Sequence, residues 1–464
     1  MSWFTKITGD TSGQAAEVDV TTKGLHTLAQ GVTTVDYNPD DFTLDAFNRL
    51  RTSNPIIAFE ASFNALTPTL ATTIWETGTV GAGSTEALTT NLYGVNLTLP
   101  VTTSVGRFIQ SINHVRYAPG ISTIFRFTFN FNNIGANIRH RIGMFTDQGT
   151  FPSTAGDGFY LENAAGALAF VRRYMTQGAG SEERVLRADW NLDKCDGTGT
   201  SGFNLNKAAV QHFVAEYQWL GVGSIRFGFQ TENGVVWAHK MVSVNSLAEA
   251  WSRTGSLPVR AEVYNTGVAA ISSLTLINCV VLQEGDVASL RGWKYFAATS
   301  GATGKVGGTA VGLYPLLSLR PASTNDLTKR ARCVPTSITV SVVVAGTVGV
   351  TPINVQLLML PTPNTGATFA VTPGGSVITV DNAATSTTAV TGSAIWAATI
   401  PNVAGSYTFD LSQMRDNANV PGYNAAGTVA ITGQSVLTLA AGPAVAAFTS
   451  AATLTATINW KEIV

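Results

Sequence analysis

Apolar and polar side chains alternate most clearly between residues 121 and 131, in the stretch ISTIFRFTFNF. Phenylalanine occupies every second position from Phe125 to Phe131, and polar residues fill the positions between them. Because successive side chains of a strand point to opposite faces, this period of two predicts a strand with one buried face. Ile138, Ile142 and Met144 repeat the pattern, so a second strand is expected there.

Residues 217–239, YQWLGVGSIRFGFQTENGVVWAH, combine glycines, aromatic residues and a histidine, as a ligand-binding loop would. The alternation favours a meander of strands instead, with Trp219 at the end of the first strand, Phe227 in the second and Trp237 in the third. LGVG and TENG supply the turns, and Asn233-Gly234 is a strong hairpin signal. Further strands are expected at 260–264 and 274–282.

The strand signals predict an all-β protein with two sandwiches. Residues 56–290 are expected to form a jelly-roll β-sandwich, because many short strands alternate with turn signals. Residues 291–312 are rich in small residues and are expected to be a linker or long loop. Residues 313–464 are expected to form a smaller C-terminal β-sandwich.

The C-terminal sandwich has an unusually uncharged sequence. Between Val334 and Trp460 the charged residues are Asp381, Asp410, Arg415 and Asp416. Exposed strands usually carry charge that prevents edge-to-edge association. We therefore expect other subunits to cover much of this surface; the alternative is that serine and threonine suffice to keep it soluble.

Residues 1–55 are polar and weakly patterned, and are expected to form an N-terminal arm. Leu44, Phe47 and Leu50 are spaced as on one face of a helix, so a short helix before Pro55 is one interpretation. An extended arm laid on a neighbouring subunit is the other. The sequence does not separate the two.

Composition and charge exclude several classes of partner. Charged residues make up 12% of the 464 residues, against about 25% in ordinary globular proteins. The net charge of −1 gives no indication of the basic surface that binds nucleic acid or an anionic membrane. Cys195, Cys279 and Cys333 lie far apart, which argues against a disulfide framework and a zinc site.

The sequence also bears on where the protein is made. The start, MSWFTKITGD, lacks a basic region followed by an apolar one, so no secretory signal is expected. The longest apolar run, residues 338–350, is too short to span a bilayer. We expect synthesis in a reducing cytoplasm, with no transmembrane segment.

The sequence contains no catalytic pattern. Residues 197–202, GTGTSG, lack the preceding strand and following helix that a dinucleotide-binding fingerprint requires, and the five histidines are dispersed. Hydrolysis of glycans needs two carboxylates across a cleft. No strand carries alternating acidic residues, and the adjacent Glu182 and Glu183 would point to opposite sides of a strand. We therefore expect no enzymatic activity and no cofactor.

A cluster of oxygen-bearing side chains is a candidate calcium site. Its members are Asp189, Asn191, Asp193 and Asp196. The first three have the spacing of a calcium-binding loop, but Lys194 and Thr200 replace the glycine and glutamate of an EF-hand. A structural calcium in a sandwich loop and an Asx-rich turn are the two interpretations.

Four tryptophans in the jelly-roll region are candidates for stacking on sugar rings. Trp219 and Trp237 occupy positions of their strands that are expected to face inward, so core packing is expected for them. Trp190 and Trp251 lie in turn-rich surroundings and are the better candidates for a glycan contact.

Eight blocks are distinctive enough to compare with known proteins: DAFNRLRTSNP, IRHRIGMFTDQGTFP, DWNLDKCDGTGTSGFNLN, EYQWLGVGSIRFGF, SLPVRAEVYNTG, LYPLLSLRP, LPTPNTGATF and INWKEIV. They resemble a family of virion structural proteins found in tailed bacteriophages and some large DNA viruses. The resemblance covers nearly the whole chain and implies a non-enzymatic component with a concanavalin-like jelly-roll. Phe47, Arg49, Leu50 and Arg51 match the family's early motif, which implies docking onto a neighbour. Asn48 departs from the glycine that often precedes this Arg-Leu-Arg block.

Two functions follow as hypotheses. The first is an oligomeric virion subunit, expected to be a trimer, that decorates the capsid or forms part of a neck, tail or fibre assembly with other virion structural proteins. The second is a carbohydrate-binding module on a virion appendage that recognises a host-surface glycan.

Overall fold

The computed structural model describes the two predicted β-rich regions with interruptions, and three short strands before them. The described residues are 7–8, 15–19, 24–26, 55–63, 75–89, 94–111, 114–132, 134–147, 151, 156–174, 181–268, 270–284, 293–299, 305–306, 312–321, 332–344, 351–360, 367–369, 373–374, 376, 378–382, 389–411, 436–444 and 452–463. All of the long elements are strands, which confirms the all-β prediction.

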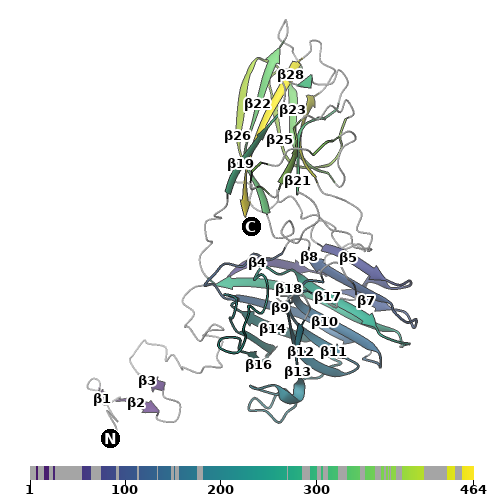
Figure 1. Cartoon of the computed structure of the whole chain (residues 1–464), viewed down its shortest axis with the longest axis vertical. Helices are drawn as coiled ribbons and strands as arrows, with labels where there is room; N and C mark the ends of the chain where they lie inside the picture. The colour runs from purple at the N-terminus through teal and green to yellow at the C-terminus, as the bar shows by residue number, and fades with distance from the viewer. Residues whose placement is uncertain are drawn as a thin grey trace.

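Seven antiparallel strands form the first sheet of the central sandwich, in the order β13–β12–β11–β10–β17–β8–β5 (Figure 1). Their bounds are β5 (Trp75–Val80), β8 (Gly106–Ser111), β10 (Ile138–Phe145), β11 (Gly158–Ala164), β12 (Ala167–Tyr174), β13 (Ser181–Leu186) and β17 (Val259–Asn265). A single 3₁₀ turn, η1 (Arg187–Asp189), follows β13.

Eight strands form the second sheet, in the order β16–β15–β14–β9–β18–β7–β6, with β4 also paired to β18. Their bounds are β4 (Pro55–Ser62), β6 (Thr85–Thr89), β7 (Gly94–Leu99), β9 (Thr123–Asn132), β14 (Gln211–Tyr217), β15 (Ile225–Thr231), β16 (Gly234–Met241) and β18 (Ser272–Glu284). The sheet joins strands far apart in sequence, because β9 pairs with both β14 and β18.

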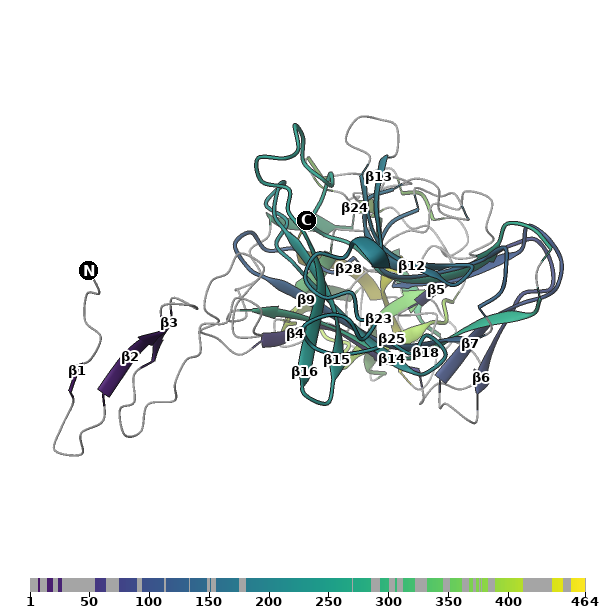
Figure 2. The same cartoon turned by 90° about the horizontal axis from the view of Figure 1, so that it is seen from below.

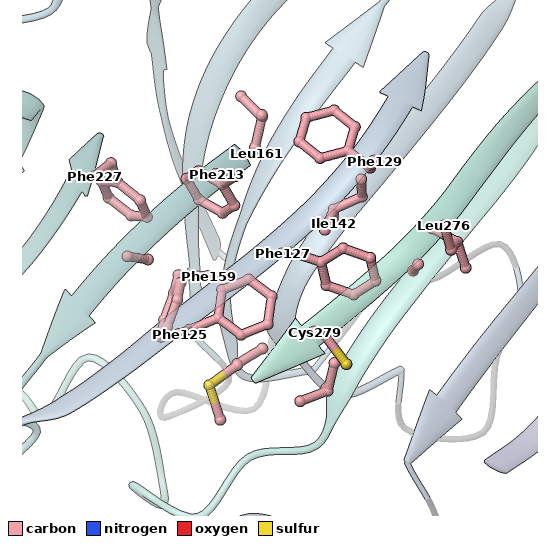
Figure 3. Packing of buried hydrophobic residues seen from close by; sticks show 14 of the residues in the cluster. Phe125, Phe127, Phe129, Ile142, Phe159, Leu161, Phe213, Phe227, Leu276 and Cys279 are labelled. Carbon is pink, nitrogen blue, oxygen red and sulfur yellow. The ribbon is translucent and has the colours of Figure 1, made fainter. Parts of the chain in front are cut away.

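The core lies between these two sheets and follows the predicted alternation. Figure 3 shows side chains from both sheets meeting there: Phe125, Phe127, Phe129, Phe213, Phe227, Leu276 and Cys279 from one, and Ile142, Phe159 and Leu161 from the other. All but Cys279 are fully buried. Burying one such side chain contributes about 1.5–3 kcal/mol, so this aromatic layer is the main source of stability of the sandwich.

The meander predicted at residues 217–239 is confirmed, with two differences in detail. Thr231 pairs with Gly234, so the hairpin loop is Glu232-Asn233 and glycine follows it with a φ of 117°. A register shift between Phe227 and Gly228 also changes the side of the sheet that Trp237 faces. Trp237 is buried against Ile124 and Val214 on the outer side of the sheet, whereas the sequence predicted it between the sheets.

The C-terminal region forms a second, smaller sandwich, drawn above the first in Figure 1. One sheet has the order β19–β28–β22–β26 with β20 also paired to β28, and the other has the order β24–β21–β27–β23–β25. The bounds are β19 (Trp293–Ala298), β20 (Lys305–Val306), β21 (Tyr314–Pro321), β22 (Arg332–Val344), β23 (Ile353–Leu360), β24 (Ile378–Asp381), β25 (Ser393–Ile400), β26 (Gly405–Asp410), β27 (Val436–Pro443) and β28 (Ala452–Ile463).

The expected linker at residues 291–312 is partly wrong. Strand β19 lies within it and pairs along its whole length with β28. Tyr295 and Ala297 face the core of the C-terminal sandwich, so this strand belongs to the sandwich. Its alternation spans only six residues and small residues follow it closely, so the sequence predicts this strand weakly.

Three short strands, β1 (Ile7–Thr8), β2 (Ala15–Asp19) and β3 (Gly24–His26), form a sheet of their own near the N-terminus. They lie apart from both sandwiches in two perpendicular views (Figures 1 and 2). The residues predicted to dock onto a neighbour, Phe47, Arg49, Leu50 and Arg51, lie outside the described residues, as does the helix considered there.

Candidate functional site

The outward face of the seven-stranded sheet carries a set of polar side chains that we call the charged face. Its members on the strands are Glu76, Gln110, Arg139, Arg141, Tyr160, Glu162, Arg173, Glu182, Arg184, Arg260, Glu262 and Tyr264; Asp147, which follows β10, joins them through its ion pair with Arg260. The strands place them outward because their apolar neighbours, such as Ile142 and Ala261, face the core. This face was not predicted from the sequence.

Arg141 lies at the centre of the charged face. The register places it opposite Glu162 on β11 and opposite Glu262 on β17. Its Nε donates to Glu162 Oε2 over 2.7 Å, and its Nη1 donates to Glu262 Oε1 over 3.0 Å. Glu162 is fully buried and also pairs with Arg139 and Arg184. One buried carboxylate therefore holds three arginines together.

Arg260 extends the network toward β8 and β5. Its Nε donates to Glu262 Oε2 over 3.0 Å, and its Nη1 lies 2.7 Å from Asp147 Oδ2. Nη1 also donates to Gln110 Oε1 over 2.8 Å, and Gln110 Nε2 donates to Glu76 Oε1 over 2.6 Å. The polar contacts thus run from β5 through β8 and β17 to β10 and β11.

Tyr160 connects the two arginine groups. The guanidinium carbons of Arg141 and Arg173 lie 5.0 Å and 5.1 Å from the centre of its ring. Its hydroxyl donates to Glu182 Oε1 over 2.9 Å and accepts from Arg173 Nη2 over 2.9 Å. Burial raises the pKa of the Tyr160 hydroxyl, so it remains protonated at neutral pH and keeps this donor role.

The two carboxylates bonded to these groups are held in their ionised form. Burial alone raises the pKa of Glu162, but the charges of Arg141 and Arg184 outweigh it and keep the pKa below its usual range. Arg173 outweighs burial in the same way and lowers the pKa of Glu182 to about 2. The general acid of a glycosidase needs a raised pKa. The lowered pKa values of Glu162 and Glu182 are the reverse of that requirement.

These pKa shifts predict that acid destabilises the fold in two steps. Burial lowers the pKa of both His140 and His212 to about 4. Below the unfolded pKa of about 6.5, the unfolded chain therefore binds protons that the folded chain does not, and stability falls. Ionised Glu162 and Glu182 stabilise the fold above the unfolded pKa of about 4.3, and this contribution is lost as the pH falls through their lowered folded pKa values, of which that of Glu182 is about 2.

Urea denaturation midpoints at pH 7, 5 and 3 should fall in that order. Replacing His140 and His212 with glutamine should flatten the decrease between pH 7 and 5 and leave the decrease below pH 4 in place. Equal midpoints at pH 7 and 5 for the unmodified protein would contradict the histidine step.

Three of the four candidate calcium ligands, Asn191, Asp193 and Asp196, are engaged with the protein itself, and Asp189 is exposed in η1. Asp193 Oδ1 accepts from the backbone N–H of Cys195, and Asp196 Oδ1 accepts from that of Thr198. Each of these two contacts joins a carboxylate to the backbone N–H two residues later, which defines an Asx turn. An Asx-rich turn is the second of the two interpretations given for this cluster. Asn191 pairs with the backbone of Lys240 in β16. Within the described ranges, no three His, Cys, Asp or Glu side chains are grouped to hold a metal ion.

The prediction that Trp190 and Trp251 contact glycans is wrong, because both are buried. Trp190 is 3% exposed and stacks on Phe170 with ring centres 4.2 Å apart. Trp251 is 0% exposed and lies edge-on to Phe159 and Tyr217 in the same core. Trp190 lies between β13 and β14 and Trp251 between β16 and β17, so both are outside the strands, yet their side chains belong to the core. Trp219 is half-buried and packs against the core, as predicted.

No family model matches the chain, and no curated protein sequence matches it. One similar solved structure comes from work on the endo-acting O-glycanases with which human gut bacteria initiate mucin breakdown. It is 11% identical, covers 50% of this chain and 100% of its own, and has a TM-score of 0.36. A pseudo β-1,3-glucanase of Mycobacterium tuberculosis is 7% identical over 49% of this chain and 99% of its own, with a TM-score of 0.35.

A third similar structure is the carbohydrate recognition domain of Emp47p. It is 11% identical over 50% of this chain and 97% of its own, with a TM-score of 0.30. At these identities and TM-scores, the likenesses carry no conclusion about function. The fold itself is a β-sandwich of two antiparallel sheets with a smaller β-sandwich after it. Among the described residues, no helix is long and apolar enough to cross a membrane.

Proposed function

We propose that the chain is a non-enzymatic carbohydrate-binding protein whose charged face contacts the sugar. The observation that supports this is the cluster around Glu162, where the side chains of Arg139 and Arg184 remain 37% and 29% exposed. Glu182, 30% exposed, adjoins Arg184 with its carboxylate 3.2 Å from Nη2. The ion pairs fix these planar donors and acceptors in advance, which lowers the entropy lost when they bind sugar hydroxyls.

Binding without hydrolysis agrees with the charge state of the same face. Glycosidases use one carboxyl group with a raised pKa as general acid and a second carboxylate across the cleft. Glu162 and Glu182 are held ionised by arginines, which disfavours a role in protonating a leaving group, and the partly exposed Glu182 can accept hydrogen bonds from sugar hydroxyls. The expected activity is recognition of a glycan that is released unchanged.

Replacing Arg184 with alanine is expected to weaken glycan binding about ten-fold or more, because a charge-assisted hydrogen bond to a ligand contributes about 1.5–3 kcal/mol. The full chain would be screened on a glycan array, and the affinity for the best glycan measured by titration calorimetry. Arg107→Ala is the matched control, since its ion pair with Glu86 lies outside the charged face.

Two results would count against this proposal. Equal affinity of the Arg184→Ala and Arg107→Ala variants would remove the charged face from the binding site. Release of new reducing ends from the bound glycan by the unmodified protein would overturn the non-enzymatic part.

The second candidate function is that of an oligomeric virion structural subunit. It is supported by the resemblance of nearly the whole chain to virion proteins of tailed bacteriophages and by the scarcity of charge in the C-terminal sandwich. The two functions combine in a virion appendage that recognises a host-surface glycan. Gold labelling of intact particles with an antibody against the chain, with mass spectrometry of the same particles, tests it. Absence of the chain from purified particles would reject the virion role.

A further inference from the structure

A cavity of about 540 Å³ opens on the C-terminal sandwich, away from every site considered above. Its lining comes from strands β19, β22, β26 and β28 of one sheet: Lys294, Tyr295, Phe296, Thr336, Ser337, Asp410, Asn459, Trp460 and Lys461. Its volume lies within the range of about 300–1,000 Å³ that is typical of small-molecule sites.

Strand register brings these residues together on the outward face of the sheet. Phe296 stands opposite Asn459, Asn459 opposite Ser337, and Ser337 opposite Asp410, so one row crosses all four strands. Asn459 Nδ2 donates to Ser337 Oγ over 2.9 Å, which fixes the middle of the row. On the other side of the sheet, Trp460 is fully buried in the core and anchors β28.

Two lysines occupy the neighbouring row of the cavity. Lys294 on β19 stands directly opposite Lys461 on β28. Like charges in this position repel each other and destabilise a strand pair. Within the described part of the chain, neither ammonium group has a carboxylate within ion-pair distance. A bound anion would relieve this repulsion.

Phe296 gives the cavity an apolar wall. Its side chain is 69% exposed, which is unusual for an aromatic residue in the middle of a strand. The amide of Asn459 and the carboxylate of Asp410 lie in the same row, so an apolar surface and hydrogen-bonding groups face one space. A sugar ring presents the same combination of a C–H face and hydroxyl edges.

The geometry points to a second ligand site, for an acidic saccharide. The ring of the sugar packs on Phe296, its hydroxyls bond to Asn459 and Asp410, and its carboxylate lies between Lys294 and Lys461. This inference rests on the proposed function in that both ligands are carbohydrates, but it uses a different sandwich and a charged class of sugar.

The test is titration calorimetry of the full chain with 3′-sialyllactose and trigalacturonate as acidic probes and lactose as the neutral probe. The acidic probes should bind about ten-fold or more tightly than lactose, as expected for charge-assisted bonds. Lys294→Ala and Lys461→Ala should abolish that preference. Phe296→Ala should weaken binding of the acidic probes about ten-fold or more.

Trp293→Ala is the matched control, because Trp293 is an aromatic residue of the same strand that is 75% exposed and does not line the cavity. Binding by Trp293→Ala should equal that of the unmodified protein. Equal affinity of the Phe296→Ala and Trp293→Ala variants would overturn the inference, as would failure of the unmodified protein to bind both acidic probes.

The proposals for the two sites can be rejected independently of each other. If Phe296→Ala binds normally while Arg184→Ala loses glycan binding, the C-terminal site is wrong and the proposed function stands. If Phe296→Ala loses the acidic probes while Arg184→Ala binds every glycan normally, the C-terminal site stands and the charged face is not a sugar site.

Discussion

Replacing Trp190 with alanine is expected to lower the free energy of unfolding of the jelly-roll sandwich by about 3–5 kcal/mol. Trp190 is almost fully buried, and its ring stacks on Phe170 with centres 4.2 Å apart. Its Nε1 also donates to the backbone oxygen of Val185 over 3.3 Å. The substitution removes the ring from a packed aromatic layer and leaves a cavity that the two sheets cannot close.

Urea denaturation followed by hydrogen exchange of the β12 and β15 amides would report the loss in this sandwich. Trp293→Ala serves as the control, since an exposed residue costs within about 0.5 kcal/mol when it is replaced. A loss below about 1 kcal/mol for Trp190→Ala would mean that the side chain is not part of the core.

The incorrect prediction that Trp190 contacts glycans shows which features of the fold can be predicted from the sequence. The alternation in β9 predicted a buried face correctly, because that pattern depends only on the geometry of one strand. The burial of Trp190 depends on Phe170 and Phe229, which come from β12 and β15 and meet it through tertiary packing. Turn residues around Trp190 describe its own loop and give no information about those partners.

The charged face was missed for a related reason. Arg139 and Arg141 alternate in β10, and Arg260, Glu262 and Tyr264 alternate in β17, so the signal was present in each strand. Alternating charge in a single strand is also typical of a solvated face. Only the register between β10, β11 and β17 places Arg141 against two carboxylates. The pairing of strands more than a hundred residues apart, such as β10 and β17, cannot be predicted from the sequence of either strand.

One wall of the C-terminal cavity, formed by Lys294, Tyr295 and Phe296, lies in the stretch that was expected to be a linker. Four residues separate Phe296 from the glycine-rich segment that begins at Gly301, and the alternation in β19 spans only six residues. A run that short predicts a strand weakly. Its pairing with the last strand of the chain, β28, gives Phe296 and Lys294 their place in the cavity.

Replacing Glu162 with alanine is expected to destabilise the jelly-roll sandwich by about 3–5 kcal/mol at pH 7. Glu162 is fully buried and pairs with Arg139, Arg141 and Arg184. The substitution leaves three neighbouring guanidinium groups, one of them buried, without their shared counter-charge. The pair between Arg107 and Glu86 is partly exposed, so Glu86→Ala should cost no more than about 1 kcal/mol.

The pH dependence of that loss distinguishes a missing charge from missing volume. The pKa of Glu162 in the folded protein lies below its usual range, so its ionised form stabilises the fold above the unfolded pKa. As the pH falls through the folded pKa, the unmodified protein also loses this charge, and the difference between the two proteins should shrink. Glu162→Gln, which keeps the side chain's shape, should show the same decrease. A difference that stays constant from pH 7 to pH 3 in both variants would assign the loss to packing, because packing does not titrate.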